Sequence, residues 1–473
     1  MVFSSPIFLF VFLPAVYLIY QLLPGIRSRN VWLALASVVF YAFGQLEYTL
    51  LLLASVLGNY LFGLWLMSGR GRKLAIAGAV VCNLLALCSF KYLDFFLRTV
   101  NSLAGLELPL LGITLPIGIS FYTFQGMSYV IDVYRDPGAG TRSLGKLILY
   151  ISFFPQLIAG PIIKYHDVSR QIDGRSLTPE QTLFGLRRFI TGLGKKLLLA
   201  NTAGQVADAV FALTAVQLDA RLAWLGAVCY TLQIYFDFSG YSDMAIGLGA
   251  MFGFTFRENF SLPYTAASIK EFWRRWHISL SSWFRDYLYI PLGGSRMGAF
   301  RTGRNKFMVF FTTGLWHGAN WTFVAWGLFH GAFSFLEEAV PAIKKLPRAI
   351  LHVYTMLVVT VGFVIFRADT IGEAIAFIGK MFTGFAFSAA SLSFDFQQLT
   401  PFFLVMLAAA IIGCAPLRPL TLKLGAAAKQ EGELPPKENF VQAALYVAAF
   451  VLLLWCIIRL SGGSYNPFIY FRF

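Results

Sequence analysis

Apolar stretches long enough to cross a lipid bilayer recur from one end of the 473-residue chain to the other. They lie near residues 6–24, 30–46, 47–67, 74–91, 111–131, 147–163, 184–205, 221–236, 240–255, 307–325, 321–340, 349–367, 401–416 and 440–460. A transmembrane helix needs about 20 residues, so the shorter stretches are expected to be re-entrant or to merge with neighbours. Hydrophobic residues make up 58% of the chain and charged residues 13%. These features predict an all-α polytopic membrane protein and exclude a disordered chain, a disulfide-rich secreted module and an ordinary cytosolic enzyme.

The charge balance is basic, with 38 Lys and Arg against 23 Asp and Glu. In a membrane protein, basic residues gather in short cytoplasmic loops, where they set the topology and meet anionic lipids, so no nucleic-acid partner is inferred. Arg27 and Arg29 follow the first apolar stretch, which lacks a cleavage site, so this stretch is expected to be a retained helix with its N-terminus outside. A hairpin over 30–67 then returns the basic residues of 70–73 to the cytoplasm.

Five cysteines, Cys82, Cys88, Cys229, Cys414 and Cys456, lie in apolar segments. None forms a C-x-x-C pair or a Cys/His metal-binding spacing. They are therefore interpreted as small buried hydrophobic residues, and no metal site is predicted.

The segment 270–306 is the most unusual in composition. It holds eight basic residues against two acids: Lys270, Arg274, Arg275, Arg285, Arg296, Arg301, Arg304 and Lys306 against Glu271 and Asp286. One interpretation is an interfacial amphipathic helix held by lipid headgroups. The other is a basic funnel mouth for a polyanionic donor such as a phosphate-rich coenzyme. The two interpretations are compatible.

Helical spacing within this segment places five side chains on one face: Trp273, Trp276, His277, Leu280 and Phe284. Arg274, Arg275 and Ser279 lie off that face. The spacing thus predicts an amphipathic helix that carries a histidine on its apolar side.

His317 lies 11 residues beyond Lys306 in an apolar run, which corresponds to about 16 Å of helix and to the middle of a bilayer. An ionisable residue there is costly, so it is either a functional group or a neutral histidine that ties two helices together. Gly314 and Gly318 flank it and permit close approach of a ligand or a backbone. His330 is interpreted as a packing or interfacial residue.

Asp237 and Asp243 interrupt another apolar run, YFDFSGYSDMAIGLG. Carboxylates within a membrane bundle need partners, so they are interpreted as ties to basic, tyrosine or backbone groups. The functional alternative is that one of them orients a catalytic histidine. The sequence lacks a G-x-S-x-G elbow, a His-x4-Asp arrangement, a dinucleotide fingerprint and a complete P-loop. His277 and His317 are therefore its best candidates for acid–base chemistry near neutral pH.

The runs EFWRRWHISLSSWFRDYLYIPLGG and GLWHGANWTFVAWGLFHG resemble the membrane-bound O-acyltransferase family. The opening MVFSSPIFLF, LPIGISFYTFQ, FFPQLIAGPI, the aspartate-containing run and the closing FIYFRF are similar to its bacterial alginate O-acetylase branch. Relatives of that branch acetylate peptidoglycan or cellulose, or transfer D-alanine to teichoic acids.

The resemblance implies a single domain over 1–473, with a catalytic core at about 115–340. It implies about 11 transmembrane helices in a ring around a central funnel, with re-entrant and interfacial helices, in a bacterial inner membrane. It further implies acetyl-CoA as the donor, no tightly bound cofactor, and an exported polysaccharide such as alginate as the acceptor. A separate periplasmic protein with a serine-hydrolase-like fold is the expected partner.

His317 and His277 match the two active-site positions of the family. A neutral histidine suits the deprotonation of an alcohol, so His317 is assigned as general base, with a covalent acyl-histidine as the alternative. His277 is expected to polarise the thioester carbonyl or to orient the donor. The expected donor-binding residues are Arg274, Arg275, Trp273, Trp276 and Asn320, and Asp237 and Asp243 are expected to support the site.

Two other functions stay open. A teichoic-acid-type D-alanyl transferase would take its acyl group from a carrier-protein thioester. A transporter or flippase would carry out no acyl chemistry, and the missing inverted repeat counts against it.

Overall fold

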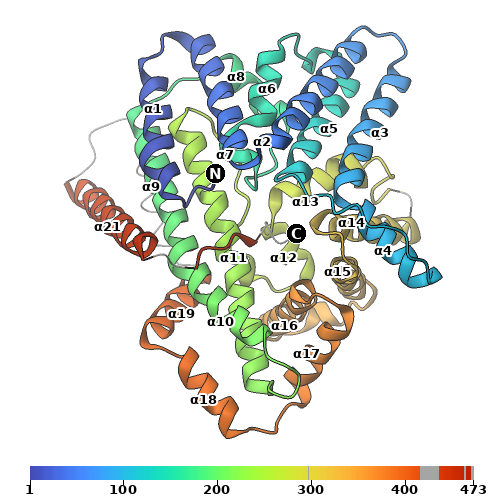
Figure 1. The fold of residues 1–473 in the computed structure, drawn as a ribbon, viewed down its shortest axis with the longest axis vertical. Helices are drawn as coiled ribbons and strands as arrows, with labels where there is room; N and C mark the ends of the chain where they lie inside the picture. Colours follow the sequence, from blue (N-terminus) through green and yellow to red (C-terminus); the bar gives the residue numbers. More distant parts are fainter. Residues whose placement is uncertain (297, 416–435, 463–464, 470–473) are drawn as a thin grey trace.

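The structure of the protein, a computed structural model, describes residues 1–296, 298–415, 436–462 and 465–469. Every regular element in these residues is helical, and no strand occurs among them (Figure 1). The predicted all-α class is therefore confirmed.

The N-terminal helices are dominated by one long bent helix. A π-helical turn (Phe8–Phe12) leads into α1 (Leu13–Leu22), followed by α2 (Gly25–Met67), α3 (Arg72–Lys91) and α4 (Leu93–Ala104). The dihedral angles of Gln45, φ −152° and ψ 58°, lie outside the helical range and break α2 in two. The predicted segments 30–46 and 47–67 are therefore the two arms of one bent helix.

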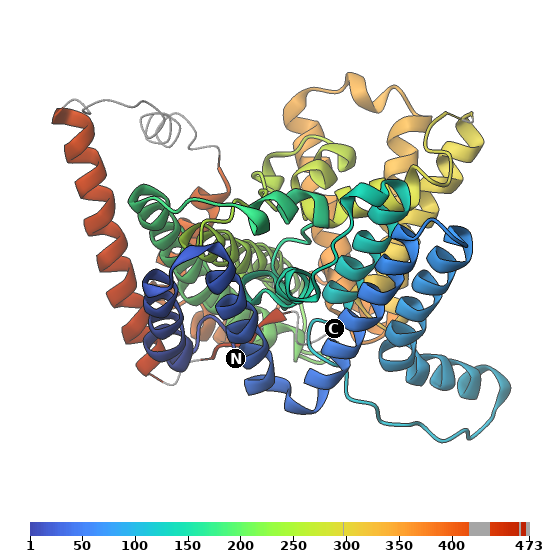
Figure 2. The same ribbon diagram turned by 90° about the horizontal axis from the view of Figure 1, so that it is seen from above.

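The bend of α2 gives the molecule two distinguishable sides. In Figure 2 both ends of α2 lie on one side, and the bend lies on the other together with the stretch 105–118. The yellow segment that precedes α14 lies on the same side as the two ends of α2. The basic clusters 27–29, 70–73 and 285–304 thus gather on one side of the protein.

The middle of the chain packs around one long helix, α11 (Ala220–Met251). Before it come α5 (Ile119–Arg135), a 3-10 turn (Pro137–Ala139), α6 (Leu144–Ser152), α7 (Phe154–Leu157), α8 (Tyr165–Asp173), α9 (Pro179–Gly194), a π-helical segment (Lys195–Ala200) and α10 (Asn201–Phe211). The predicted separation of 221–236 from 240–255 is wrong, because both stretches belong to the uninterrupted α11.

Helices α9 and α11 approach each other at pairs of glycines. A Cβ added at Gly192 would come within 2.5 Å of the carbonyl oxygen of Gly240, and one added at Gly185 would come as near to that of Gly247. Small residues at this spacing let two helix backbones pack closely, as is common in membrane proteins.

The second half begins with short helices and continues with longer ones. A 3-10 turn (Pro263–Thr265) precedes α12 (Ile269–Arg275), α13 (Ile278–Phe284), a π-helical turn (Arg285–Tyr289), α14 (Ala299–His317), α15 (Trp321–Ala339), a 3-10 turn (Ile343–Lys345) and α16 (Arg348–Arg367). It ends with α17 (Ile371–Thr383), α18 (Ala389–Gln398), α19 (Pro401–Cys414) and α21 (Pro436–Ser461).

Four helical segments in the described residues are long and apolar enough to cross a membrane: Gly25–Met67, Arg72–Lys91, Arg348–Arg367 and Gln442–Ser461. The pair α18 and α19, bent by 72°, adds a fifth if it is one broken span. The chain is therefore a multi-pass membrane protein, and the expected 11 spans in a ring stay a prediction.

The predicted burial of all five cysteines is partly wrong. Cys229 and Cys456 are buried and Cys414 is half-buried, but Cys82 and Cys88 are exposed. Both exposed residues belong to α3, a candidate membrane span, whose apolar outer surface does not need to be covered by protein.

Candidate active site

His317 is the last residue of α14, not a residue in the middle of a longer helix. The predicted span 307–325 ends there because Gly318 and the N-terminal capping of α15 by Asn320 turn the chain. The side-chain oxygen of Asn320 accepts the amide of Thr322, and its amide nitrogen donates to the carbonyl of Asp369. Both ends of this side chain are thus used by the fold, whereas the sequence assigned it to donor binding.

The two glycines beside His317 bring α14 and α15 together. A Cβ at Gly314 would collide with the backbone of Phe323, and one at Gly318 would collide with its ring. The predicted close approach is confirmed, and the approaching group is a neighbouring helix.

The imidazole of His317 lies in an aromatic enclosure and is only 6% exposed. Its ring centroid is 5.1 Å from that of Trp326, 5.2 Å from that of Phe366 and 5.1 Å from that of Trp316, each in an edge-to-face arrangement. Rings packed in this way exclude water and fix the imidazole plane.

His277 is brought to the same place by a break in the predicted amphipathic helix. The helix is not continuous, since α12 ends at Arg275, α13 begins at Ile278, and His277 between them has φ 44° and ψ 54°. The amide of Ile278 donates to the carbonyl of Asn259, and the amide of Ser261 donates to the carbonyl of Arg275. These backbone bonds to a preceding loop replace the helical ones.

The break buries His277 completely and places its ring centroid 6.4 Å from that of His317. Trp316 contacts both histidines: its ring centroid lies 5.8 Å from that of His277 and 5.1 Å from that of His317. The two histidines that the sequence singled out therefore share one site.

The residues around His277 include a polar group that the sequence did not indicate. Asn259 is fully buried. Its Oδ1 atom lies 3.1 Å from the Nδ1 atom of His277. The loop that holds Asn259 has no hydrophobic periodicity, so no pattern in the sequence could have placed it here.

The two tryptophans of the basic segment have different surroundings. Trp276 is buried against Phe260 and Phe272 and borders the same small cavity as His317. Trp273 packs edge-on against His330 and lines a different cavity on the basic side. Of the two, Trp273 alone borders a space large enough to receive part of a donor.

Arg274 and Arg275 also have different surroundings. Arg274 is exposed and lines a cavity of 250 Å³ together with Lys270, Lys306 and Thr313. Arg275 turns back to the protein, where it donates to Glu271 over 2.7 Å and to the carbonyl of Ser261 over 3.1 Å.

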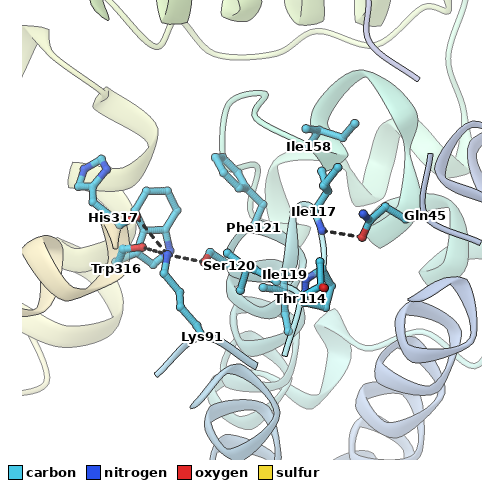
Figure 3. A pocket seen from close by; sticks show the side chains of 13 residues that line it. Gln45, Lys91, Thr114, Ile117, Ile119, Ser120, Phe121, Ile158, Trp316 and His317 are labelled. Carbon is cyan, nitrogen blue, oxygen red and sulfur yellow. Dashed lines mark hydrogen bonds between the residues drawn. The ribbon is translucent and has the colours of Figure 1, made fainter. Parts of the chain in front are cut away.

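A second cavity, of 390 Å³, is lined by His317 at the C-terminal end of α14 (Figure 3). Trp316 and His317 form one wall, and the segment 114–121 with Gln45 forms the opposite one. The 250 Å³ cavity borders Thr313, one helical turn earlier. Successive turns of α14 thus line two cavities, one toward the basic side and one toward the bend of α2.

Lys91 fixes the end of α14 at the second cavity. Its Nζ atom donates to the carbonyl of Trp316 over 2.6 Å, to that of His317 over 3.2 Å and to the hydroxyl of Ser120 over 3.3 Å (Figure 3). A cation at a helix C-terminus satisfies carbonyls that have no helical partner. The sequence did not indicate this role, because a lysine at the end of an apolar stretch is typical of any membrane helix.

Asp237 and Asp243 are ties within the bundle, as the first interpretation predicted. Asp237 pairs with Lys196 at 2.7 Å, and Asp243 pairs with Arg188 at 2.7 Å and Lys195 at 2.6 Å. Neither aspartate contacts an active-site histidine in the described part of the chain, so the alternative in which one orients a histidine gains no support from these contacts.

Asp237 also holds the end of the chain against the site. Its second carboxylate oxygen accepts the backbone amide of Ile469 over 2.8 Å. Ile469 borders the small cavity next to His317. The residues 470–473, which complete the closing motif, lie outside the described residues.

His330 is fully buried among aromatic rings, with neither ring nitrogen bonded to any described residue. Its ring packs on Phe272, Trp273 and Trp326. Its surroundings agree with the predicted packing role. No group of three or more His, Cys, Asp or Glu side chains suited to a metal ion is found within the described ranges.

Comparisons with known proteins agree with this arrangement. The model of the membrane-bound O-acyltransferase family matches residues 139–375. The probable alginate O-acetylase AlgI of Azotobacter vinelandii is 40% identical over the full length of both chains. The peptidoglycan O-acetyltransferase of Helicobacter pylori is 36% identical over 80% of each chain. The teichoic acid D-alanyltransferase of Bacillus subtilis is 28% identical over 53% of this chain and 67% of its own.

A multi-pass helical protein with these similarities is a membrane-bound acyltransferase. The chain belongs to the membrane-bound O-acyltransferase family, and it is an O-acyltransferase. The family resemblance of its histidine-containing runs is thereby confirmed.

Proposed function

We propose that the protein takes an acetyl group from acetyl-CoA on the cytoplasmic side of a bacterial inner membrane and transfers it outward for the O-acetylation of an exported polysaccharide such as alginate. The single observation that carries this proposal is the approach of the His277 and His317 rings to 6.4 Å, where α14 lines one cavity with Thr313 and another with His317. The names of the Azotobacter vinelandii and Helicobacter pylori relatives favour acetyl as the group and a polysaccharide as the final acceptor.

The basic cavity is the proposed donor entrance. Lys270, Arg274 and Lys306 line it, together with Thr313 of α14. Basic side chains attract and bind the phosphates of a coenzyme, and the positive-inside rule places this side in the cytoplasm. The thioester end would then extend toward the histidines.

The cavity beside the bend of α2 is the proposed acceptor entrance. It lies at the opposite end of α14 from the basic segment and includes His317 in its wall. An acceptor hydroxyl that enters here reaches the wall formed by Trp316 and His317 without crossing the donor cavity. We further propose that a periplasmic protein with a serine-hydrolase-like fold receives the acetyl group and delivers it to the sugar.

In the proposed reaction, the imidazole of His317 removes the proton from the acceptor hydroxyl as its oxygen attacks the thioester carbonyl carbon. The new C–O bond forms, the C–S bond breaks, and the coenzyme leaves as a thiol after it takes up the proton from the imidazolium of His317. A general base of this kind contributes about 10²–10⁴-fold to a rate. The role of His277 depends on which of its ring nitrogens carries the proton.

The test is the release of free coenzyme thiol by the purified protein in lipid nanodiscs, with acetyl-CoA or a D-alanyl carrier-protein thioester as donor. We expect turnover with acetyl-CoA, and a loss of about 10²–10⁴-fold in His317→Ala at normal abundance. His352→Gln is the matched control, because His352 bonds to the carbonyl of Ala266 and lines neither cavity.

Three results would contradict parts of the proposal. Near-wild-type acetylation by a normally accumulating His317→Ala variant contradicts the catalytic assignment. Turnover with the carrier-protein thioester alone indicates D-alanyl transfer instead. An absence of turnover with either donor, in the presence of membranes that supply the acceptor, would favour a transporter.

A further inference from the structure

The carboxamide of Asn259 is placed to control the protonation of one active-site histidine. Its Oδ1 atom lies 3.1 Å from the Nδ1 atom of His277, 2.9 Å from the hydroxyl oxygen of Ser279 and 3.2 Å from the backbone nitrogen of Ser279. Its Nδ2 atom donates to the hydroxyl of Ser242 over 3.0 Å. The side chains of these four residues are less than 8% exposed.

The orientation of this amide follows from one fixed donor. A backbone N–H can only donate, so the atom that faces the nitrogen of Ser279 must be the oxygen of Asn259. The same oxygen faces Nδ1 of His277, and an amide oxygen can only accept. Nδ1 of His277 therefore carries a proton.

The opposite tautomer is disfavoured by the surrounding distances. If Nδ1 were unprotonated, it would need a donor, and the hydroxyl of Ser279 lies 3.4 Å away. That hydroxyl is closer to Asn259, at 2.9 Å, and it already accepts the amide of Ile162. Without the Nδ1 proton, two acceptors would face each other at 3.1 Å in a buried site, which is unfavourable.

A neutral imidazole has one proton, so its other nitrogen must be the basic one. Nε2 of His277 is buried and has no hydrogen-bond partner among the described residues. The ring is held at its side by Phe238, whose centroid is 4.6 Å away in an edge-to-face arrangement. His277 thus keeps a fixed lone pair on Nε2 that no described residue engages, in a ring whose centroid lies 6.4 Å from that of His317.

We propose that Asn259 is a positioning residue that locks His277 in the Nδ1–H tautomer, so that its Nε2 atom stays unprotonated and serves the active site as a hydrogen-bond acceptor. The expectation that His277 polarises the thioester carbonyl would need a proton on Nε2, and this tautomer does not supply one. Asn259 acts through His277 and touches no substrate. The catalytic part of this inference rests on the proposed acyl transfer, whereas the tautomer does not.

The tautomer is measured on the full-length protein in nanodiscs by ¹⁵N magnetic resonance with labelled histidine. The chain has five histidines, and the His277→Gln variant assigns the signal. We expect the wild-type signal to show a protonated Nδ1 and an unprotonated Nε2. A protonated Nε2, in either the other tautomer or the imidazolium, overturns the proposal.

Variants then test whether Asn259 is the cause. Asn259→Ala should release the tautomer, and Asn259→Asp, which keeps an accepting oxygen, should retain the Nδ1 proton. Ser242→Ala is the matched control, because it removes the bond on the far side of the amide and leaves Oδ1 in place. An unchanged tautomer in folded Asn259→Ala refutes the proposal.

Kinetics with acetyl-CoA connect the tautomer to catalysis. We expect Asn259→Ala to lower kcat about 10- to 100-fold, as loss of an orienting partner commonly does, with little change in KM for the donor. In a His277→Gln background the same substitution should have no further effect on kcat, because the group it acts through is gone. Additive losses overturn the positioning role. If acetyl-CoA is not turned over at all while the tautomer is as expected, the proposed function fails and the tautomer assignment stands.

Discussion

Charge reversal at Arg274 should weaken donor binding without harming the fold. Arg274 is exposed, lines the 250 Å³ cavity and forms no ion pair within the described residues, so no internal contact is lost in Arg274→Glu. If its guanidinium meets a coenzyme phosphate, loss of that charge-assisted bond costs about 1.5–3 kcal/mol, or roughly 10- to 150-fold in the dissociation constant. Repulsion from the new carboxylate adds to this loss.

The adjacent arginine provides the contrast, because its contacts are internal. Arg275 bonds to Glu271 and to the carbonyl of Ser261. Ser261 belongs to the loop whose backbone hydrogen bonds stabilise the helix break at His277. Arg275→Glu should therefore lower abundance and thermal stability, and the protein that survives should keep its affinity for the donor. The sequence alone gave both arginines the same role.

The assay is equilibrium binding of acetyl-CoA to purified, correctly inserted protein, measured at fixed ionic strength because screening weakens such contacts. Arg296→Glu is the control, since Arg296 is exposed in the same basic segment and does not line the cavity. The reasoning is refuted if Arg274→Glu binds acetyl-CoA as the wild type does, or if Arg296→Glu loses as much affinity.

Two further predictions test the topology and the packing of α14. A cysteine at exposed Ser295 should resist an impermeant thiol reagent in intact cells and react after lysis, above the wild-type background; labelling from outside would place the basic segment in the periplasm. Gly327→Ala should destabilise the protein by about 1–3 kcal/mol in thermal unfolding, because its Cβ would collide with the carbonyl of Phe310. Gly379→Ala, whose Cβ meets nothing within 4 Å, should be nearly neutral, and equal shifts in the two variants would contradict the packing argument.

The sequence predicts well those helices whose apolar runs end at charged residues. The predicted 74–91 and 349–367 correspond to Arg72–Lys91 and Arg348–Arg367. Hydropathy and positive charge act locally in both cases, so a window along the chain contains all the information needed.

The sequence fails where stabilising partners are distant. The sequence predicts separate spans at 221–236 and 240–255, on either side of Asp237, yet α11 continues through Asp237 and Asp243. Lys196, Lys195 and Arg188 neutralise these carboxylates from the preceding helical segments. An ion pair of this kind removes the penalty that a hydropathy pattern assigns to each charge alone.

The sequence likewise indicates some residues of the active site and not others. His317 stood out because an ionisable residue in an apolar run is costly, and His277 because helical spacing placed it on the apolar face of a basic segment. Neither argument needs knowledge of the fold. The 6.4 Å separation of the two histidine rings depends on the chain leaving the helical path at His277, which periodicity did not predict. Asn259 carries no charge and lies in an irregular loop, so nothing in its local sequence marks it.

At the helix break, the backbone preference of His277 conflicts with the orientation that its side chain needs in the active site. A non-glycine residue in the left-handed region costs about 1–3 kcal/mol, and a continuous helix would avoid that cost. The loop bonds from Ser261 and Ile278 offset it in part, and they also align Oδ1 of Asn259 with the imidazole. A change that restored the helix across His277 would break the backbone bond from Ile278 to Asn259 and remove the acceptor for Nδ1. The strained residue is therefore best explained by the histidine orientation that it produces, since the apolar side chains of α12 and α13 could also be buried along an unbroken helix.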